Sequence, residues 1–175
     1  VSSKTARLIG RENISDSNGA IIELVKNAYD ADADSVYINF DIIFENIPEN
    51  IYISEIKKYF SEDEFNYIIS CYNQEGDKLT KKSDLTVEQN EIIKNILFSK
   101  NKIIIFDNGT GMNEKIIKTV WMNIGTRDKE INTYSKKGRI KTGAKGIGRF
   151  ALEKLSQKTT VFTKTEDDQP VYWNI

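Results

Sequence analysis

Three polar side chains recur on one face of a predicted helix near the start of the sequence. Glu23, Asn27 and Asp30 lie in ELVKNAYDADADSV, and a rotation of about 100° per residue brings them within roughly 60° of one another. A solvent-facing stripe on an amphipathic helix is the simpler interpretation. This stripe, however, consists of two carboxylates and an amide, and only Lys26 lies at its edge. Because the chain contains no histidine, any acid–base chemistry falls to carboxylates such as these.

A second set of candidate residues follows the apolar run of NKIIIFDNGTGM. Asp107, at the predicted end of a strand, is an acceptor that can read an amine. Gly109 and Gly111 allow a sharp turn and the close approach of a flat ring, and Met112 adds a soft apolar surface. A purely structural turn between a strand and a helix would explain the glycines alone.

The segment GRIKTGAKGIGRF combines four glycines with Lys141, Lys145 and Arg149. Glycines let backbone N–H groups converge on an anion, and the helix predicted to follow presents its positive N-terminal end. The segment lacks the GK[ST] ending of a P-loop, and no strand immediately precedes its GxxGxG pattern. A phosphate cradle and a flexible surface segment are therefore both compatible with it.

The order of these motifs, ExxxNxxDA, DxGxGM and GxxGxG, resembles the GHKL superfamily of ATPases, named for gyrase, Hsp90, histidine kinases and MutL. The residues that carry the resemblance are Glu23, Asn27, Asp30, Ala31, Asp107, Gly109, Gly111, Met112, Gly143, Gly146 and Gly148. NIGT, at 123–126, looks like the corresponding turn of Hsp90-type proteins, and GAKGIGRFALEKL is similar to bacterial Hsp90-like or MORC-like ATP-binding proteins. The likeness does not include residues 45–101.

The resemblance implies Mg²⁺-dependent binding and hydrolysis of ATP. Glu23 would orient and deprotonate the attacking water, and Asn27 would give its amide oxygen to Mg²⁺. Asp107 would accept a hydrogen bond from the exocyclic amine of adenine. The other nucleotide contacts implied are Asp30, Ala31, Gly109, Gly111, Met112, Asn123, Gly143, Lys145, Gly146, Ile147, Gly148, Arg149 and Phe150. In the gyrase and MutL branches a lysine from a second domain completes the γ-phosphate site, so 1–175 alone is expected to be weakly active or inactive.

Several elements must position these residues. The sequence predicts a helix that is capped at Asp16 or Ser17 and ends near Asp32, followed by a strand at 35–44. It further predicts a buried strand before Asp107 and a helix after Met112. A helix over 149–156 and a final strand pair around EDDQ complete the series. The resemblance implies an α+β fold: a Bergerat-type two-layer α/β sandwich whose mixed sheet carries helices on one face.

Two segments interrupt this plan. Residues 45–101 are interpreted as an inserted helical hairpin, with amphipathic helices at 53–71 and 86–99 joined by the polar NQEGDKLTKKSD. Residues 126–148 are interpreted as an ATP lid whose closure reshapes a dimer surface. The domain is expected to span 1–175 as the N-terminal part of a longer protein.

Composition limits the classes of protein. A chain of 175 residues with 39% hydrophobic and 29% charged residues is typical of one soluble globular domain. The formal net charge of -1 provides no general attraction to nucleic acid or to an anionic membrane. Cys71 is the only cysteine, which excludes an internal disulfide and favours a reducing compartment. No apolar run has the length of a membrane span, so the cytoplasm is the expected location.

Two alternatives belong to other classes. A histidine-kinase catalytic domain is disfavoured, because such kinases usually carry Asn where Glu23 stands and phosphorylate a histidine that this chain lacks. A nucleic-acid-binding module is suggested by residues 127–149, where eight basic residues face two acidic ones. A solvated lid is the simpler explanation of that run and is favoured over a nucleic-acid footprint. A homodimer, a client protein, DNA and a defence effector are all compatible partners of such an ATPase.

Overall fold

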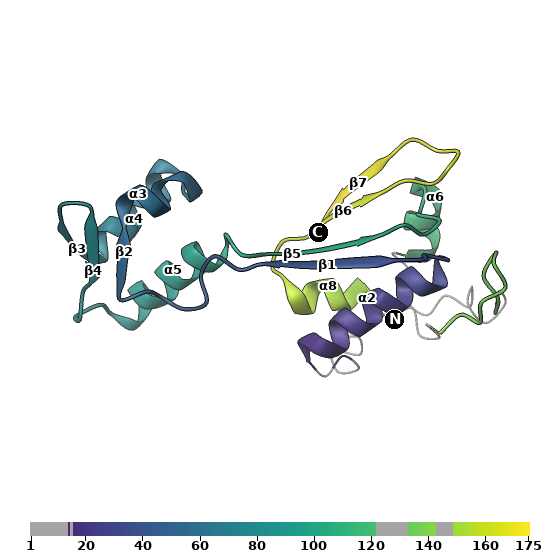
Figure 1. Cartoon of the computed structure of the whole chain (residues 1–175), viewed down its shortest axis with the longest axis horizontal. Helices are drawn as coiled ribbons and strands as arrows, with labels where there is room; N and C mark the ends of the chain where they lie inside the picture. The colour runs from purple at the N-terminus through teal and green to yellow at the C-terminus, as the bar shows by residue number, and fades with distance from the viewer. Residues whose placement is uncertain (1–13, 15, 122–132, 143–148) are drawn as a thin grey trace. The chain divides into compact units, whose positions relative to one another are not determined.

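The computed structural model describes residue 14 and residues 16–121, 133–142 and 149–175 (Figure 1). The chain divides into two compact units. Unit 1 combines the described residues up to Tyr37 with those from Phe106 to Ile175, and unit 2 is the continuous segment Ile38–Ile105. Both units contain helices and strands, which confirms the mixed α+β character expected from the sequence. The two-layer sandwich itself stays a prediction.

Two helices pack together in unit 1. Helix α2 (Ser17–Asp30) begins at Asp16, whose carboxylate accepts a hydrogen bond from the Gly19 backbone N–H at 2.7 Å, as an N-cap should. Helix α8 (Arg149–Leu155) lies beside it (Figure 1). The buried residues of the core that they share are Ile14, Ala20, Phe150 and Ala151, with Leu24 and Leu155 packed at its margin. This apolar contact fixes the orientation of α2 and of its polar face.

The apolar side of α2 is divided between that core and an open groove. Leu24 contacts the core and Ala28 is buried. Ile21 and Val25, which the periodicity places on the same apolar side, instead line a cavity of about 360 Å³. Its other described lining residues are Ile22, Lys26, Tyr29 and Thr142. Only part of the apolar surface of α2 is therefore buried by described residues.

Four of the described strands lie wholly or partly in unit 1. Strand β1 (Val36–Asp41) pairs with β5 (Lys102–Asp107), and the boundary between the two units crosses both strands. Strands β6 (Thr160–Thr163) and β7 (Val171–Asn174) form an antiparallel pair with Thr160 opposite Asn174. The strand pair around EDDQ is thus confirmed.

Burial of β5 is a prediction that proved wrong. Ile104 and Phe106 remain 48% and 61% exposed. Within the described ranges β5 pairs only with β1, so its second edge is uncovered. An apolar run of strand length indicates a strand, but it does not show what covers the strand.

The chain after β5 returns to helix only briefly. Asn113 caps helix α6 (Glu114–Ile116) by accepting a hydrogen bond from the Ile116 N–H at 2.9 Å. The helix continues as the π-helical turn η2 (Ile117–Trp121). The predicted helix after Met112 is therefore present, with a change of winding after one turn.

Unit 2 contains strands as well as helices, which corrects the purely helical interpretation of residues 45–101. Its elements between β1 and β5 are β2 (Asn50–Tyr52), α3 (Ile53–Ile56), η1 (Lys57–Tyr59), α4 (Glu62–Ser70), β3 (Tyr72–Glu75), β4 (Lys78–Lys81) and α5 (Val87–Phe98). The strands form an antiparallel sheet in the order β2-β4-β3. The polar linker between the predicted helices is therefore a β-hairpin.

Local signals explain these elements. Gly76, with φ +61°, occupies the first central position of the two-residue turn between β3 and β4, where a positive φ favours glycine. Ser61 and Glu64 form a capping box that starts α4, which explains why the single helix expected over 53–71 is broken. Thr86 and Gln89 form the corresponding box at α5.

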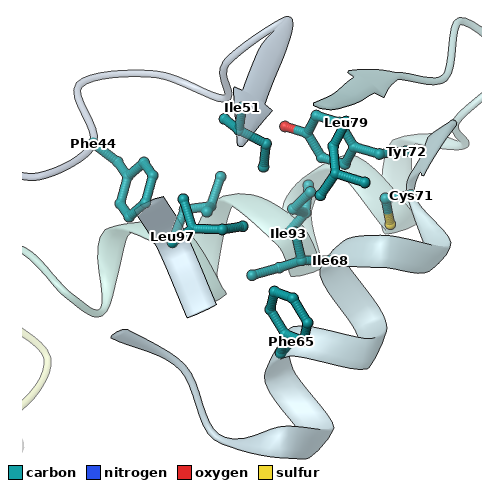
Figure 2. Packing of buried hydrophobic residues seen from close by; sticks show 10 residues of the cluster. Phe44, Ile51, Phe65, Ile68, Cys71, Tyr72, Leu79, Ile93 and Leu97 are labelled. Carbon is teal, nitrogen blue, oxygen red and sulfur yellow. The ribbon is translucent and has the colours of Figure 1, made fainter. Parts of the chain in front are cut away.

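The sheet and helices of unit 2 enclose their own hydrophobic core (Figure 2). Its fully buried members include Ile68 from α4, Leu79 from β4, and Ile93 and Leu97 from α5. Tyr72 donates its hydroxyl hydrogen to the Pro48 carbonyl at 2.7 Å, and burial raises the pKa of this phenol. Unit 2 thus has the packing of a folded module in its own right.

None of the helices in the described ranges combines the length and the apolar composition that a membrane crossing requires.

Candidate functional site

The DNGTGM loop is joined by hydrogen bonds to the chain that follows α2. The Asn108 side-chain oxygen accepts hydrogen bonds from the backbone N–H groups of Asp34 and Ser35, both at 2.9 Å. The Thr110 N–H donates to the Ala31 carbonyl at 2.7 Å. Two motifs far apart in the sequence therefore meet in unit 1 through hydrogen bonds of backbone groups.

Close backbone approach explains both glycines of this loop. A Cβ on Gly109 would lie 2.7 Å from the Ala31 carbonyl oxygen. Gly111 has φ +65°, and a Cβ there would lie 2.0 Å from the carbonyl oxygen of Lys164, which follows β6. The loop is thus held between the end of α2 and the end of β6, at distances that only glycine permits.

Gly111→Ala is expected to destabilise the protein more than Gly138→Ala. Both glycines have positive φ, at +65° and +78°, so each alanine would cost about 1 to 2 kcal/mol from the left-handed backbone alone. Nothing lies near the Cβ that Gly138 would gain, whereas Gly111 would also collide with Lys164. Chemical denaturation of the two variants measures the difference. Equal losses of unfolding free energy would contradict the close packing of the loop against β6.

The ends of the loop are also fixed. Asp107 Oδ1 accepts a hydrogen bond from the Gly109 N–H at 2.9 Å, which closes the turn, and the Asp107 side chain remains exposed. The Met112 N–H donates to Thr163 Oγ1 at 2.8 Å. Asn113 Nδ2 donates to Asp168 at 3.1 Å, and hydrogen bonds from Thr165 and Asn113 hold the pKa of Asp168 below its usual value. The carboxylate of Asp107 is thus presented by a rigid turn.

The polar face of α2 is partly committed to neighbours. Glu23 pairs with Lys26 at 2.8 Å, and both side chains are partly exposed. Asn27 is half-buried, and its side chain makes no hydrogen bond to another described residue. Asp30 is buried, with 9% exposure, and accepts hydrogen bonds from the Thr142 N–H at 2.7 Å and from the Thr142 hydroxyl at 3.2 Å. The Asn27 amide oxygen is therefore available to a ligand.

Segment 133–142 contacts the chain just after α2. Ser135 Oγ and the Lys137 N–H donate to the two oxygens of Asp32. The Lys137 ammonium pairs with Asp34 at 2.8 Å, and Arg139 pairs with the same carboxylate at 2.9 Å. The hydrogen bond from Ser135 is the main cause of a lowered pKa at Asp32, and that from Lys137 is the main cause at Asp34.

A polar cavity of about 300 Å³ lies beside this contact. Its described lining residues are Asp30, Asp32, Thr110, Tyr134, Ser135, Lys136 and Lys141. They come from α2 and the turn after it, from the DNGTGM loop and from segment 133–142, and all belong to unit 1. The volume is at the lower end of the range of small-molecule sites.

The structure brings together some of the sequence-predicted residues and not others. Asp30, Ala31 and Gly109 adjoin one another, and Asp107, Gly111 and Met112 complete the same loop. Phe150 lies fully buried in the α2–α8 core, so its side chain is not exposed to a ligand, and Arg149 begins α8. The predicted residues that lie outside the described residues are Asn123, Gly143, Lys145, Gly146, Ile147 and Gly148.

Sequence reasoning overlooked several residues that build the site: Asp32, Asp34, Asn108, Thr110, Arg139, Thr142 and Thr163. Asp32 and Asp34 had a detectable signal, because DADADS alternates acidic residues directly after a helix end. Nothing in the sequence pairs them with segment 133–142. Thr163 is one of many threonines in predicted strands, and its hydrogen bond to the loop is visible only in the structure.

The described residues hold no group of three or more carboxylates, cysteines or histidines arranged to bind a metal ion by themselves. A nucleotide-bound Mg²⁺ does not need such a group, because phosphate oxygens and water supply most of its octahedral shell. The amide oxygen of Asn27, on the same helix face as Glu23, has no hydrogen bond to another described residue.

Comparison with known proteins identifies the family. The model of the family described as histidine kinase-, DNA gyrase B-, and HSP90-like ATPase matches residues 80–173, which is more than half of the chain. The chain belongs to this family of ATPases, and ATP is the nucleotide that the assignment supports. The match includes the DNGTGM loop but not Glu23–Ala31. No curated protein and no solved structure matches the chain.

Proposed function

We propose that this domain binds ATP with Mg²⁺ and hydrolyses it, in a larger Hsp90-like or MORC-like protein. The observation that carries the proposal is the junction of the DNGTGM loop with the end of α2. Through Asn108, Gly109 and Thr110, this junction sets the exposed carboxylate of Asp107 in the same unit as the polar face of α2. Membership of the ATPase family supports the nucleotide independently of that geometry.

Each candidate residue of α2 and of the DNGTGM loop has a distinct proposed role. Asn27 would give its amide oxygen to Mg²⁺, and the bound ion would neutralise the charge of the phosphate groups. Glu23 orients the attacking water and takes its proton. Asp107 accepts from the adenine amine, while Ala31 and Met112 border the ring.

The phosphate contacts are proposed to come mainly from the glycine segment. Lys145, Arg149 and the backbone from Gly143 to Phe150 are the residues proposed for this role, with Asn123 as a further phosphate or ribose contact. Asp30 supports ribose or phosphate contacts through water. Residues 126–148 are proposed to act as a lid that closes on the nucleotide and reshapes a dimer surface.

Calorimetric titration of the chain with ATP, ADP and GTP, with and without Mg²⁺, tests the binding step. The proposal predicts that ATP binds more tightly with Mg²⁺ than without it and more tightly than GTP. No heat of binding with any adenine nucleotide would refute it. Binding of ATP without turnover would favour the second candidate, a nucleotide-gated switch that acts on a nucleic acid or a defence effector.

Hydrogen exchange in segment 133–142 is expected to slow when nucleotide binds. A non-hydrolysable ATP analogue should protect these amides more than ADP does, because only the γ-phosphate reaches the far part of the lid. Mass spectrometry of the peptides covering Thr133–Thr142 measures the effect, and peptides of unit 2 provide the control. Equal protection by both nucleotides would identify a passive surface loop. Salt-sensitive protection by double-stranded DNA would favour the nucleic-acid alternative.

A further inference from the structure

We propose that Asp32 and Asp34 are positioning residues, which hold segment 133–142 on the end of α2 so that Lys136 and Lys141 bind the phosphate groups of the nucleotide. This inference rests on the proposed function, because it assigns phosphate contacts within the same site. Neither aspartate belongs to the ExxxNxxDA, DxGxGM or GxxGxG motifs, and both lysines, although they lie within the proposed lid, have no individual contact assigned in the proposal above.

The contact between segment 133–142 and the turn after α2 is built from many charge-assisted hydrogen bonds. Asp32 accepts from Ser135 and Lys137, and Asp34 accepts from Lys137 and Arg139. Arg139 also donates to the Ala33 carbonyl at 2.6 Å. Hydrogen bonds between ionised groups are shorter and stronger than neutral ones, and several acting together fix a segment better than one exposed ion pair does.

Further contacts join the C-terminal half of the segment to α2 itself. The Arg139 guanidinium lies 5.3 Å from the ring centre of Tyr29, within the range of a cation–π contact. Thr142 donates to Asp30. Inside the segment, Tyr134 and Ile140 form an antiparallel bridge, and the Arg139 N–H donates to Ser135 Oγ at 3.0 Å. The segment is therefore a closed hairpin with a defined face toward α2.

Asp32 combines an uncommon backbone conformation with a buried carboxylate. Its φ is +61°, a left-handed conformation that is uncommon outside glycine, and its side chain is only 4% exposed. A buried carboxylate is unfavourable unless donors surround it, and those donors come from Ser135, Lys137 and Arg139. The left-handed conformation also ends α2, because the N–H groups of Asp32 and Ala33 donate to the carbonyls of Tyr29 and Ala28, both at 3.0 Å.

The cations of the segment divide into two groups. Lys137 and Arg139 are committed to Asp32 and Asp34. Lys136 and Lys141 line the polar cavity instead, and neither side chain has an ion pair or hydrogen bond with another described residue. The Lys141 backbone is fixed by its hydrogen bond to the Thr133 carbonyl at 2.9 Å. The contact with α2 therefore leaves two lysines at the cavity, where an anion can satisfy them.

The chemistry of the cavity fits a polyphosphate. Lysine ammonium groups bind phosphate oxygens as point charges, and the Thr110 hydroxyl adds a donor or acceptor from the glycine loop. The charges of Asp30 and Asp32 are engaged by donors from segment 133–142, which limits their repulsion of an anion. Asp30, which lies on the polar face of α2, belongs to the described lining of the cavity, whereas Glu23 and Asn27 do not.

The first test compares ATP, AMP and inorganic tripolyphosphate binding to Lys141→Met and to Lys78→Met, a control in unit 2. Lys141→Met should raise the Kd of ATP and of tripolyphosphate about tenfold and leave that of AMP nearly unchanged. Lys136→Met should act in the same direction. An unchanged Kd for tripolyphosphate in both lysine variants would overturn the assignment. If the wild-type chain binds tripolyphosphate but neither ATP nor ADP, the proposed function fails while this assignment stands.

The second test asks whether Asp32 acts through the lysines. Asp32→Asn suits the site because asparagine tolerates positive φ, and Asp77→Asn is the matched control: Asp77 also accepts a backbone N–H and a hydroxyl, both from Ser54. Asp32→Asn should weaken tripolyphosphate binding severalfold, and its effect should not add to that of Lys141→Met. Additive effects would overturn the positioning role.

Hydrogen exchange separates positioning from general stability. Asp32→Asn and Asp34→Asn should speed exchange of the amides in segment 133–142 while leaving those of α5 unchanged. Asp34→Glu, which keeps the charge, should restore slow exchange. Faster exchange throughout unit 1, or AMP binding weakened as much as ATP binding, would mean that the aspartates are merely structural and would refute the inference.

Discussion

Glu23→Gln is expected to leave ATP binding intact and to slow hydrolysis by about 10²- to 10⁴-fold, the usual effect of losing a general base. The reason is that the two side chains on this face of α2 are proposed to act at different stages of the reaction. A carboxylate that takes the proton of water acts mainly in the transition state, whereas a metal ligand also holds the ground-state nucleotide. Single-turnover hydrolysis and calorimetric titration of the same variant separate the two effects.

Two control variants separate the proposed general-base role of Glu23 from metal binding and from the loss of its ion pair. Asn27→Ala should lose Mg²⁺-dependent binding itself, because the amide oxygen is the proposed metal ligand. Lys26→Met removes the ion pair of Glu23 at 2.8 Å and retains the carboxylate, so it should keep most of the activity. If the Glu23 variant hydrolyses ATP at the wild-type rate, the general-base role is wrong. If wild-type protein binds ATP without turnover, the domain acts as a switch.

Local motifs were predictable because local chemistry determines them. The cap at Asp16, the strand ending at Asp107 and the turn glycines each follow from propensities within a few residues. The junction of DNGTGM with α2 was inferred only through the family resemblance. Its physical basis, the hydrogen bonds of Asn108 and Thr110, needs coordinates, since the partners are more than seventy positions away.

The contact of segment 133–142 illustrates what periodicity cannot predict. Ser135 and Asp32 are separated by 103 positions, and their hydrogen bond depends on a left-handed residue at the end of α2. From sequence alone, DADADS is an acidic turn and SKKGR is a basic surface run. Only the fold shows that the two neutralise each other, which also explains why a basic run need not be a nucleic-acid footprint.

The hairpin of unit 2 was missed for a different reason. Its β4 strand buries one apolar residue, Leu79, so NQEGDKLTKKSD shows no alternation that would indicate a sheet. The glycine at position 76 was the available signal, since a two-residue turn with positive φ favours a hairpin. The overall polarity of the segment instead favours a linker between two helices, and that interpretation is wrong.

Asp107→Asn is expected to weaken ATP binding by about 10- to 100-fold and to narrow the preference for ATP over GTP. The turn itself should survive, because an asparagine carbonyl oxygen can still accept the Gly109 N–H as Asp107 Oδ1 does at 2.9 Å. The second oxygen becomes an NH₂ group, which donates instead of accepting. Because the exocyclic amine of adenine is also a donor, the new NH₂ group cannot accept a hydrogen bond from it. The NH₂ group can, however, donate to the carbonyl oxygen that guanine carries at the same position.

The control for this substitution is Asp168→Asn. Asp168 belongs to the same unit, and its carboxylate accepts hydrogen bonds from the side chains of Asn113 and Thr165. This variant should leave both affinities nearly unchanged, because Asp168 holds Asn113 and Thr165 and no base contact is proposed for it. Titration of each variant with ATP and GTP, after its unfolding curve shows a folded chain, gives the comparison. Equal ATP affinity in wild type and Asp107→Asn would remove Asp107 as the base-reading residue. The family assignment would still stand, and the adenine contact would have to come from another residue around the DNGTGM loop.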